Sequence, residues 1–312
     1  MEIRDQALVA LGQELRSSGY QFTVTTPTTH RLVLERATTH VTPEAVWGWN
    51  APFRANCIGK NLLALIQQAG ELDQREGWLK SNVRFATLGE LVFVHSGFPT
   101  NARDSVFFGP DTYRFARALR LAVSNMIPAQ PFTVIDIGCG SGAGGLLTAA
   151  QLLPLRSDIV LSDINEQALR FSRINAEING FPHAQTVYSD VFEHIAMMAD
   201  LIVSNPPYLV DDRERLYCHG GCNLGLDLSL RIAEQSLGHL KPGGRLVLYT
   251  GSPVVAGSDL FLETLRPILE GTWPYSYEEI DPDVFGDELA KPVYGHVDRI
   301  AAVVLTVTNE GV

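Results

Sequence analysis

A short apolar run that ends in a cluster of glycines sets the strongest constraint on the fold of this chain. Residues 132–142 have the sequence FTVIDIGCGSG, and helix-forming residues follow from about 143 to 153. β-Branched residues bounded by glycines are typical of a buried strand that enters a tight turn. Glycines let the backbone approach a ligand closely, and a helix that begins there presents unpaired N–H groups. This segment therefore predicts a strand, turn and helix that bind a cofactor.

The residues after this turn alternate between predicted strands and predicted helices. Strands are expected at 158–164, 200–205, 245–251 and 299–307, and helices at 166–179, 228–239 and 259–270. A turn with the sequence KPGG is expected at 241–244, before the third of these strands. Strands separated by helical segments indicate a doubly wound, mostly parallel sheet with helices on both faces. We expect an α/β fold with a seven-stranded, Rossmann-like sheet.

The last 40 residues differ from this alternation. Residues 275–280 and 299–307 have strand composition, and the segment between them is acidic and contains prolines. It holds no helix long enough for a crossover between parallel strands. An antiparallel hairpin at the edge of the sheet is therefore expected.

The first 105 residues predict a smaller, mixed α+β domain. Helices are expected near 5–17 and 60–69, and strands at 82–88 and 90–96. Pro110 and Asp111 precede a helix of about 14 residues that opens the second domain. We therefore expect a substrate-recognition domain at 1–105 and a catalytic domain at 106–312.

Charge is distributed unevenly between these units. Residues 1–130 carry a net charge of +2 and residues 131–312 a net charge of −13, which together make −11. The negative net charge argues against a protein that coats nucleic acid nonspecifically. The positive net charge of the first unit is compatible with a basic face there. The chain lacks an apolar run of membrane-spanning length, and its four cysteines form no disulfide pattern. We expect a cytoplasmic protein without membrane contact; its oligomeric state is left open.

The glycine turn is compatible with two nucleoside-type cofactors. Gly140, Gly142 and Gly145 fit the G-x-G-x-x-G pattern of dinucleotide-binding proteins, which is weak evidence when it stands alone. Asp163 ends the next strand, 21 residues after Gly142, where a carboxylate can accept hydrogen bonds from ribose hydroxyls. A nicotinamide-dependent oxidoreductase therefore stays open at this point.

Two further carboxylates refine this expectation. Asp136 precedes the first glycine, and an anion there is poorly placed beside a diphosphate but well placed near an ammonium group. Asp190 follows a third candidate strand, close to where an adenine amino group would lie. A cofactor with a cationic amino-acid moiety is thus favoured over a dinucleotide.

The sequence Asn205-Pro206-Pro207-Tyr208 follows another buried strand. Two prolines remove backbone donors and fix φ, so the chain leaves the sheet in a stiff, set direction. A planar nitrogen with two hydrogens can donate one to the Asn205 side-chain carbonyl and one to the Pro206 carbonyl, while Tyr208 stacks on its plane. Both acceptors favour positive charge on a nitrogen that attacks an electrophile.

These motifs together resemble the class I S-adenosylmethionine-dependent methyltransferases. Within that class the chain resembles the release-factor glutamine methyltransferase group and related small-domain N-methyltransferases, over about residues 105–312. The resemblance implies that the catalytic residues are Asn205, Pro206 and Tyr208. The cofactor-binding residues that it implies are Asp136, Gly138, Cys139, Gly140, Gly142, Asp163, Ile164, Asp190, Val191 and Asn205.

The resemblance implies direct methyl transfer from S-adenosylmethionine to a planar nitrogen, without a metal. A protein glutamine amide is the first choice of acceptor, followed by a base in structured RNA and then by a small metabolite. A cofactor-binding module without catalytic activity is a rival from another class.

A cysteine–histidine cluster, an aromatic segment and a charged run are three further candidates for functional roles. Cys218, His219 and Cys222 provide fewer ligands than structural zinc needs, so we interpret them as loop residues near the acceptor pocket. Trp47, Trp49 and Phe53 are expected in the core rather than in a stacking surface. The charged run 211–215 is interpreted as a solvated loop.

Overall fold

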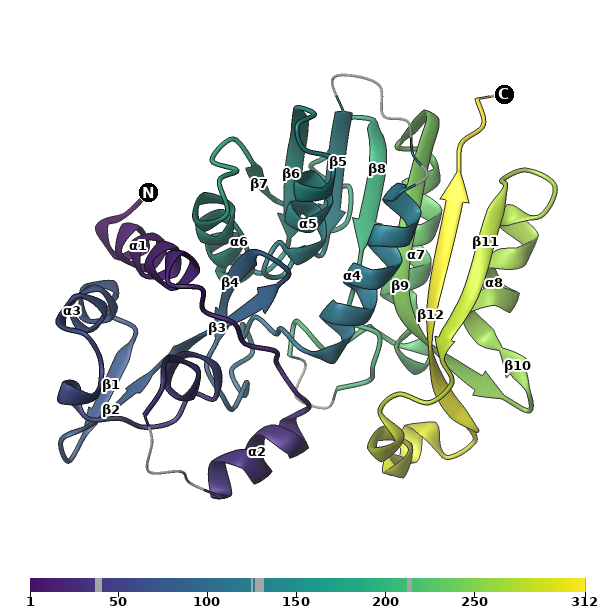
Figure 1. Ribbon diagram of the computed structural model, residues 1–312. Coiled ribbons are helices and arrows are strands. Elements are labelled where there is room, and N and C mark those ends of the chain that lie inside the picture. Colours follow the sequence, from purple (N-terminus) through teal and green to yellow (C-terminus); the bar gives the residue numbers. More distant parts are fainter. Residues whose placement is uncertain (37–40, 125, 127–131, 212–214, 312) are drawn as a thin grey trace.

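A mixed sheet forms the centre of the protein in a computed structural model that describes residues 1–36, 41–124, 126, 132–211 and 215–311 (Figure 1). Its strand order is β11-β12-β9-β8-β5-β6-β7, and the short β10 pairs with β9. The strands are β5 (Phe132–Ile137), β6 (Ser157–Asp163), β7 (Gln185–Tyr188), β8 (Ala199–Ser204), β9 (Leu240–Val255), β10 (Ser258–Asp259), β11 (Tyr275–Asp281) and β12 (Arg299–Thr308). The pairings among β7, β6, β5, β8 and β9 are parallel, which confirms the expected doubly wound α/β fold.

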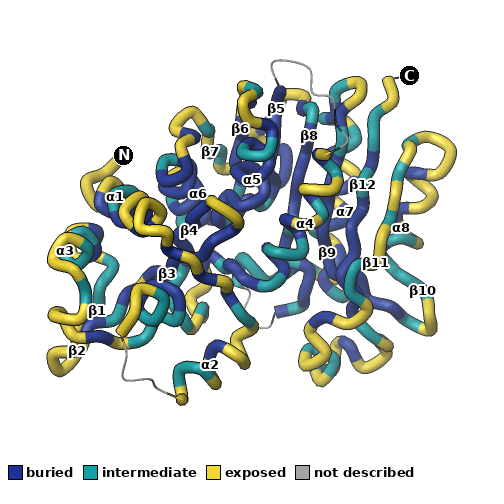
Figure 2. The backbone as a smooth tube through the Cα atoms, viewed as in Figure 1, coloured by how far each residue is buried: buried dark blue, intermediate teal, exposed yellow. Residues whose placement is uncertain are grey.

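Helices cover both faces of this sheet. Successive strand residues point to opposite sides, and the buried apolar residues on each side pack against helices. Leu161 packs in one hydrophobic cluster and its neighbour Val160 in the other. The first cluster includes α4 (Pro110–Ser124), α5 (Ala143–Gln151) and α6 (Glu166–Ile178), and the second includes α7 (Asp227–Leu237) and α8 (Leu260–Leu269). Figure 2 shows the resulting buried strands at the centre. Within the described ranges, no helix has the length and apolar character needed to cross a membrane.

The edge hairpin is confirmed, and one neighbouring expectation is wrong. β12 pairs antiparallel with both β11 and β9, so β11 forms the edge. The predicted turn at residues 241–244 is instead part of β9, which begins at Leu240. The pairing with β8 shifts there from Leu240 to Arg245, so the prolyl and glycyl residues form an irregularity inside the strand.

The N-terminal region contains the expected elements and several that the sequence patterns did not indicate. The expected ones are α1 (Ile3–Ser17), α3 (Lys60–Ala69), β3 (Val83–Leu88) and β4 (Leu91–Ser96). The additional ones are α2 (Pro27–Glu35), a π-helical turn (Glu44–Gly48), a 3-10 turn (Ala55–Cys57), β1 (Leu72–Arg75) and β2 (Trp78–Ser81). Glu76 and Gly77 join β1 to β2 with positive φ values, as a tight hairpin turn requires. We propose a domain boundary near residue 105.

The tryptophan-rich segment lies in the core, as expected. Trp47 and Phe53 are fully buried. Trp49 is partly buried and packs edge-on against Phe22, with ring centroids 5.1 Å apart. These rings therefore stabilise the N-terminal unit and do not form an exposed stacking surface.

Asn175 on α6 and Asn179, the C-terminal cap of that helix, fasten the N-terminal unit to the second unit. The Asn175 side chain accepts a hydrogen bond from Val94 N (2.7 Å) and donates one to Val94 O (3.0 Å). Asn179 makes the equivalent pair with Val92, at 3.0 and 2.8 Å. The two amides thus pair with the outer edge of β4 as a further strand would. Asn175 also donates to Ser141 O (2.9 Å) in the glycine turn, which links the two units to the site.

Candidate active site

The carboxyl ends of three adjacent strands bring the predicted motifs together. Ile137 on β5 pairs with Ser162 on β6 and with Ser204 on β8. The residues that follow these positions, Gly138 and Asn205, therefore leave the sheet beside each other. The Ser204 hydroxyl donates to Ile137 O (2.7 Å) and ties the two strand ends together. Ligands of doubly wound folds bind at this edge.

A cavity of about 1170 Å³ opens at this edge. Its volume exceeds the roughly 300–1,000 Å³ that is usual for the site of one small molecule, so it can hold a cofactor and part of an acceptor. The predicted site residues that line it are Asp136, Gly138, Cys139, Gly140, Asp163, Ile164, Asp190, Val191, Asn205, Pro206 and Tyr208. Gly142 does not line it; this residue has a φ of +78° and packs against Ser172 and Leu161. Gly142 thus shapes the glycine turn on the side that packs against the protein interior.

The glycine turn forms a cradle suited to a cofactor. Gly138 and Gly140 have φ values of +66° and +53°, which strongly favour glycine. A Cβ atom at either position would meet no protein atom within 4 Å, so the backbone faces open space. Side chains there would occupy that space. The two glycines therefore fit a ligand that lies directly on the backbone.

Asp136 lies beneath this cradle with an altered pKa. Its side chain is 1 % exposed, and Oδ2 accepts a hydrogen bond from Gly145 N (2.8 Å) in the first turn of α5. Burial raises the pKa of this carboxyl to about 7, and the nearby Asp163 carboxylate adds to the increase. A cationic ligand would favour the ionised form. Asp136 can therefore combine a helix-capping role with recognition of an ammonium group.

The other two carboxylates differ in exposure. Asp163 accepts hydrogen bonds from Gly140 N and Asn165 N, both at 2.9 Å, and burial raises its pKa. It thereby holds the glycine turn against the end of β6. Asp190 is exposed and forms an ion pair with Arg231 on α7. Both acids line the cavity at successive strand ends, where a ribose and a base would follow the glycine turn.

The Asn-Pro-Pro-Tyr turn presents Asn205 and Tyr208 to the same cavity. Within the described ranges, the Asn205 side chain has no hydrogen-bond partner, so its carbonyl is available to a ligand. Tyr208 is 6 % exposed. Burial raises the pKa of its phenol well above the usual value, and the Asp111 charge adds to this. Tyr208 is therefore neutral, and its ring can serve as a wall.

Three glycines allow the backbone of this turn to pack closely. A Cβ at Gly251 would lie 2.3 Å from the Tyr208 ring. A Cβ at Gly225 would lie 2.4 Å from Tyr208 O, and one at Gly220 would lie 2.7 Å from Tyr208 Cα. The segment 220–225 and Gly251 thus support Tyr208 through close packing.

Sequence reasoning missed the contribution of the segment between β11 and β12. Lys291 Nζ donates to Val210 O (2.9 Å), and Val210 N donates to the Tyr294 hydroxyl (2.8 Å). Both backbone groups of Val210 are thus held by this segment. Phe285 lines the cavity, and its ring centroid lies 5.9 Å from that of Tyr208. The acidic composition had suggested only a connecting loop.

The interpretation of the loop after the Asn-Pro-Pro-Tyr turn as a solvated loop is wrong for two of its residues. Asp211 is 4 % exposed and forms a bidentate pair with Arg215, at 2.7 and 2.9 Å. This pair lowers the pKa of Asp211 to about 2, chiefly through the hydrogen bonds from Arg215. These two residues are therefore an internal ion pair and not a solvated surface. Residues 212–214 of the charged run lie outside the described residues.

The same loop contacts the N-terminal side of the cavity. The Tyr217 hydroxyl donates to Thr100 O (3.0 Å), and the Tyr217 ring stacks on Phe107 with centroids 5.3 Å apart. Phe98, Thr100 and Phe107 also line the cavity, and sequence patterns did not indicate Phe98 or Thr100. His219 lines the cavity and accepts from Asp211 N (3.3 Å).

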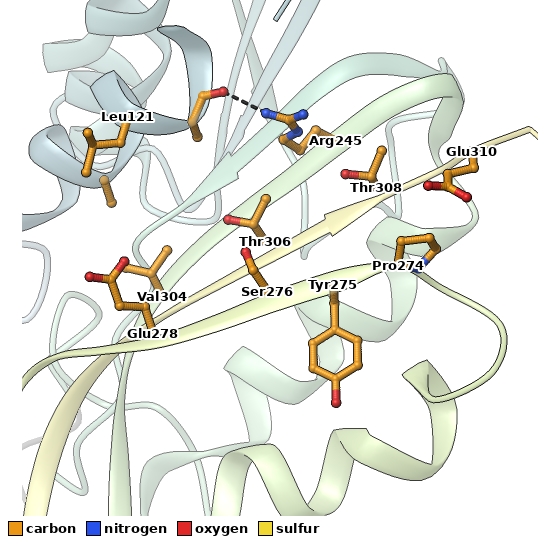
Figure 3. A pocket seen from close by; sticks show the side chains of 12 residues that line it. Leu121, Arg245, Pro274, Tyr275, Ser276, Glu278, Val304, Thr306, Thr308 and Glu310 are labelled. Carbon is orange, nitrogen blue, oxygen red and sulfur yellow. Dashed lines mark hydrogen bonds between the residues drawn. The ribbon is translucent and has the colours of Figure 1, made fainter. Parts of the chain in front are cut away.

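A second cavity of about 540 Å³ lies between α4, β9, β11 and β12 (Figure 3). Arg245 Nη1 donates to Ala122 O (2.7 Å) at its rim. Arg245 begins the main pairing of β9 with β8, so this cavity is at the opposite end from Asn205. Its described lining contains no residue of the glycine turn or of the Asn-Pro-Pro-Tyr turn, so it is separate from the candidate site.

Comparison with known proteins agrees with this arrangement. Residues 113–260 match the family model "Methyltransferase small domain". The chain is 34% identical over 134 residues to a release factor glutamine methyltransferase from Lactococcus lactis, which covers 38% of this chain and 47% of that protein. It is 29% identical over 126 residues to a ribosomal RNA small subunit methyltransferase C from Cronobacter sakazakii, with 40% and 33% covered. The chain thus spans a third to about half of these relatives.

Solved structures include similar chains at low sequence identity. TrmN from Thermus thermophilus has a TM-score of 0.44 at 18% identity, with 92% of this chain and 80% of that chain covered. Trm5 from Methanocaldococcus jannaschii in complex with adenosine has a TM-score of 0.48 at 13% identity, with 75% and 60% covered. S-adenosylmethionine is the cofactor that the matched family implies. Residues 113–260 of this chain are thus similar to a methyltransferase small domain.

Proposed function

We propose that this protein is an S-adenosylmethionine-dependent N-methyltransferase whose acceptor is the side-chain amide of a protein glutamine. One observation carries the proposal. The glycine turn with its carboxylates and the Asn205–Tyr208 turn line a single cavity at the carboxyl edge of the sheet. A cofactor on the glycine turn and an acceptor at Asn205 would therefore meet in one cavity.

Each residue has a defined role in this proposal. Bound S-adenosylmethionine supplies an electrophilic methyl group. Asp136 would hold the cofactor's ammonium group, Asp163 its ribose and Asp190 its adenine. The Asn205 side-chain carbonyl and the Pro206 carbonyl would each accept one N–H of the acceptor, which orients the nitrogen lone pair. These acceptors stabilise the positive charge that develops on the attacking nitrogen, so they act most strongly in the transition state.

The rim of the cavity favours a neutral acceptor over a nucleic acid. Asp283 and Asp287 line one side, and a phosphate backbone is repelled by carboxylates. Thr26, Thr28, Thr100 and Asn101 line the N-terminal side and offer uncharged hydrogen-bonding groups. The relative named as a release factor glutamine methyltransferase supports the same class of acceptor. An RNA base is the second candidate, because the rRNA methyltransferase relatives match over similar lengths and Arg103 lies at the rim.

Labelled donor and fractionated cell extract would test this proposal. The protein is incubated with methyl-labelled S-adenosylmethionine and with separate protein, RNA and small-molecule fractions. We expect label in the protein fraction, located on glutamine by mass spectrometry. Asn205→Ala should lower the rate by about 10²- to 10³-fold, in line with the loss of one group that stabilises transition-state charge. The exposed Asn61→Ala on α3 is the matched control and should keep the wild-type rate.

Two outcomes would contradict different parts of the proposal. Label confined to RNA or to the small-molecule fraction would refute the glutamine acceptor. An Asn205→Ala enzyme with the wild-type rate would refute the catalytic role of the Asn-Pro-Pro-Tyr turn, whatever the acceptor is.

A further inference from the structure

Helix α2 is held to the rest of the protein mainly by one side chain. All residues of α2 are described, and among them His30 alone is buried, at 1 % exposed, whereas Leu32 is 41 % exposed. Figure 1 shows α2 apart from the other helices, on the side toward which the parallel strands point, and Figure 2 shows most of it outside the core. Thr26, Pro27 and Thr28 at its N-terminal end line the large cavity. α2 therefore borders the cavity and depends on His30 for its attachment.

The partners of His30 fix its protonation state. Arg84 Nη1 lies 3.2 Å from His30 Nδ1, and Trp49 O lies 2.8 Å from His30 Nε2. A guanidinium only donates and a carbonyl only accepts, so Nδ1 must be unprotonated and Nε2 must carry the hydrogen. A second proton on Nδ1 would place two donors against each other. The contact that holds α2 is therefore made by the neutral imidazole.

The surroundings of this histidine oppose a positive charge. Arg84 on β3 is 2 % exposed, and it donates to His30 and to Ser96 O (3.3 Å), neither of which is a carboxylate. The other titratable groups that face His30 are Lys80 on β2 and the fully buried His95 on β4. Burial lowers the pKa of His30 to about 4, and the charges of Arg84 and Lys80 add to the decrease. A proton on His30 would therefore add positive charge beside a buried cation.

We propose that α2 is a lid on the acceptor side of the cavity and that His30 is its latch, the residue that positions Thr26 and Thr28 at the rim. A helix of nine residues is too short to persist alone in water, so an unlatched α2 would also lose its helical hydrogen bonds. The His30 ring packs against Phe98, with centroids 4.2 Å apart, and Phe98 lines the cavity as well. Release of the latch would therefore open the cavity on this side. The role toward the acceptor rests on the proposed function, whereas the latch does not.

Hydrogen exchange of the cofactor-free protein tests the latch without methylation. The docked contact is fully formed above a pH of about 6.5, the ordinary pKa of histidine, and is lost as the pH falls toward about 4. Protection of the α2 amides, corrected for intrinsic exchange, should therefore fall about 30-fold from about pH 7.5 to about pH 5, while β12 keeps its protection. His30→Gln keeps a donor toward Trp49 O and does not titrate, so its α2 protection should not change with pH. The exposed His194→Gln is the matched control and should behave as wild type.

Two results of this experiment would overturn the latch. Protection of α2 in the wild type that does not depend on pH would show that other contacts hold the helix. In His30→Ala we expect α2 alone to lose its protection at about pH 7.5. Loss of protection in β3 and β4 as well would show a core side chain instead of a latch.

The role of the lid toward the acceptor has a separate readout. His30→Ala should raise the KM of the labelled protein fraction about tenfold and leave kcat within about twofold, because the rim hydroxyls of α2 are displaced. An unchanged KM would refute contact between the lid and the acceptor. If the wild-type protein methylates no fraction, the proposed function fails, and the exchange experiment still decides whether His30 is a latch.

Discussion

Replacement of Asn175 by alanine should weaken both the fold and the cofactor site. The Asn175 side chain is fully buried and makes three hydrogen bonds with backbone groups. Two of these groups belong to Val94 on β4 and one to Ser141 in the glycine turn. The alanine variant leaves all three backbone groups without this partner at the contact between the two units.

The size of the effect follows from the number of groups left unpaired. A buried backbone donor or acceptor that loses its partner costs about 1–3 kcal/mol. Three such groups lower the free energy of unfolding by about 3–6 kcal/mol, since water reaches some of them in the variant. A protein of this size would lose about 10 °C in melting temperature.

Asn179→Ala provides a closely matched control. The Asn179 side chain also makes three hydrogen bonds with backbone groups, but they belong to Val92 and to Asn175 and not to the glycine turn. Both variants should therefore lose similar stability in thermal unfolding. Calorimetry should show weaker binding of S-adenosylhomocysteine only for Asn175→Ala.

Two results would refute this reasoning. A loss of less than about 1 kcal/mol in both variants would mean that the amides do not hold β4 against α6. Equal changes in S-adenosylhomocysteine affinity would mean that the bond to Ser141 does not shape the glycine turn.

Two other perturbations test the remaining features of the site. Because burial raises the pKa of Asp136 to about 7, binding of S-adenosylhomocysteine should weaken as the pH falls from 8 to 6 and this carboxylate is protonated. The same raised pKa lowers the stability of the cofactor-free protein as the pH rises from about 4 to about 7. Asp136→Asn should flatten the pH dependence of both affinity and stability. A wild-type affinity that does not depend on pH would contradict the role of Asp136 in binding. Gly251→Ala places a Cβ 2.3 Å from the Tyr208 ring, so methyl transfer should fall at least tenfold while S-adenosylhomocysteine affinity stays within about twofold. Full activity of this variant would show that the position of Tyr208 is not critical.

Local patterns predicted the sheet and the positions of the main motifs. The strand before Gly138 and the strand before Asn205 were both recognisable, because apolar residues end there in glycines or prolines that restrict the backbone. Parallel strands then place both turns at one edge. By contrast, the strand start predicted at residue 245 is wrong, since Leu240 already pairs with Ala199 on β8 and residues 241–244 lie inside β9 as an irregularity.

The sequence patterns did not indicate the residues that complete the site from distant parts of the chain. Phe285 and Tyr208 are neighbours only because Val210 is bound by Lys291 and Tyr294. Asn175 carried one visible signal, since asparagine is disfavoured inside a helix, and Asn179 follows four residues later at the C-terminal cap. Their partners on β4 could not be inferred from that spacing.

The sequence alone determined the α/β class, the cofactor turn and the Asn-Pro-Pro-Tyr turn. Those features arise from backbone restrictions and apolar periodicity, which act over a few residues. The tertiary structure alone decided which face of Tyr208 is bounded by Phe285, how Asp136 is buried, and how the N-terminal unit meets α6. Such contacts depend on packing and hydrogen bonding between segments far apart in the chain, and no local pattern encodes them.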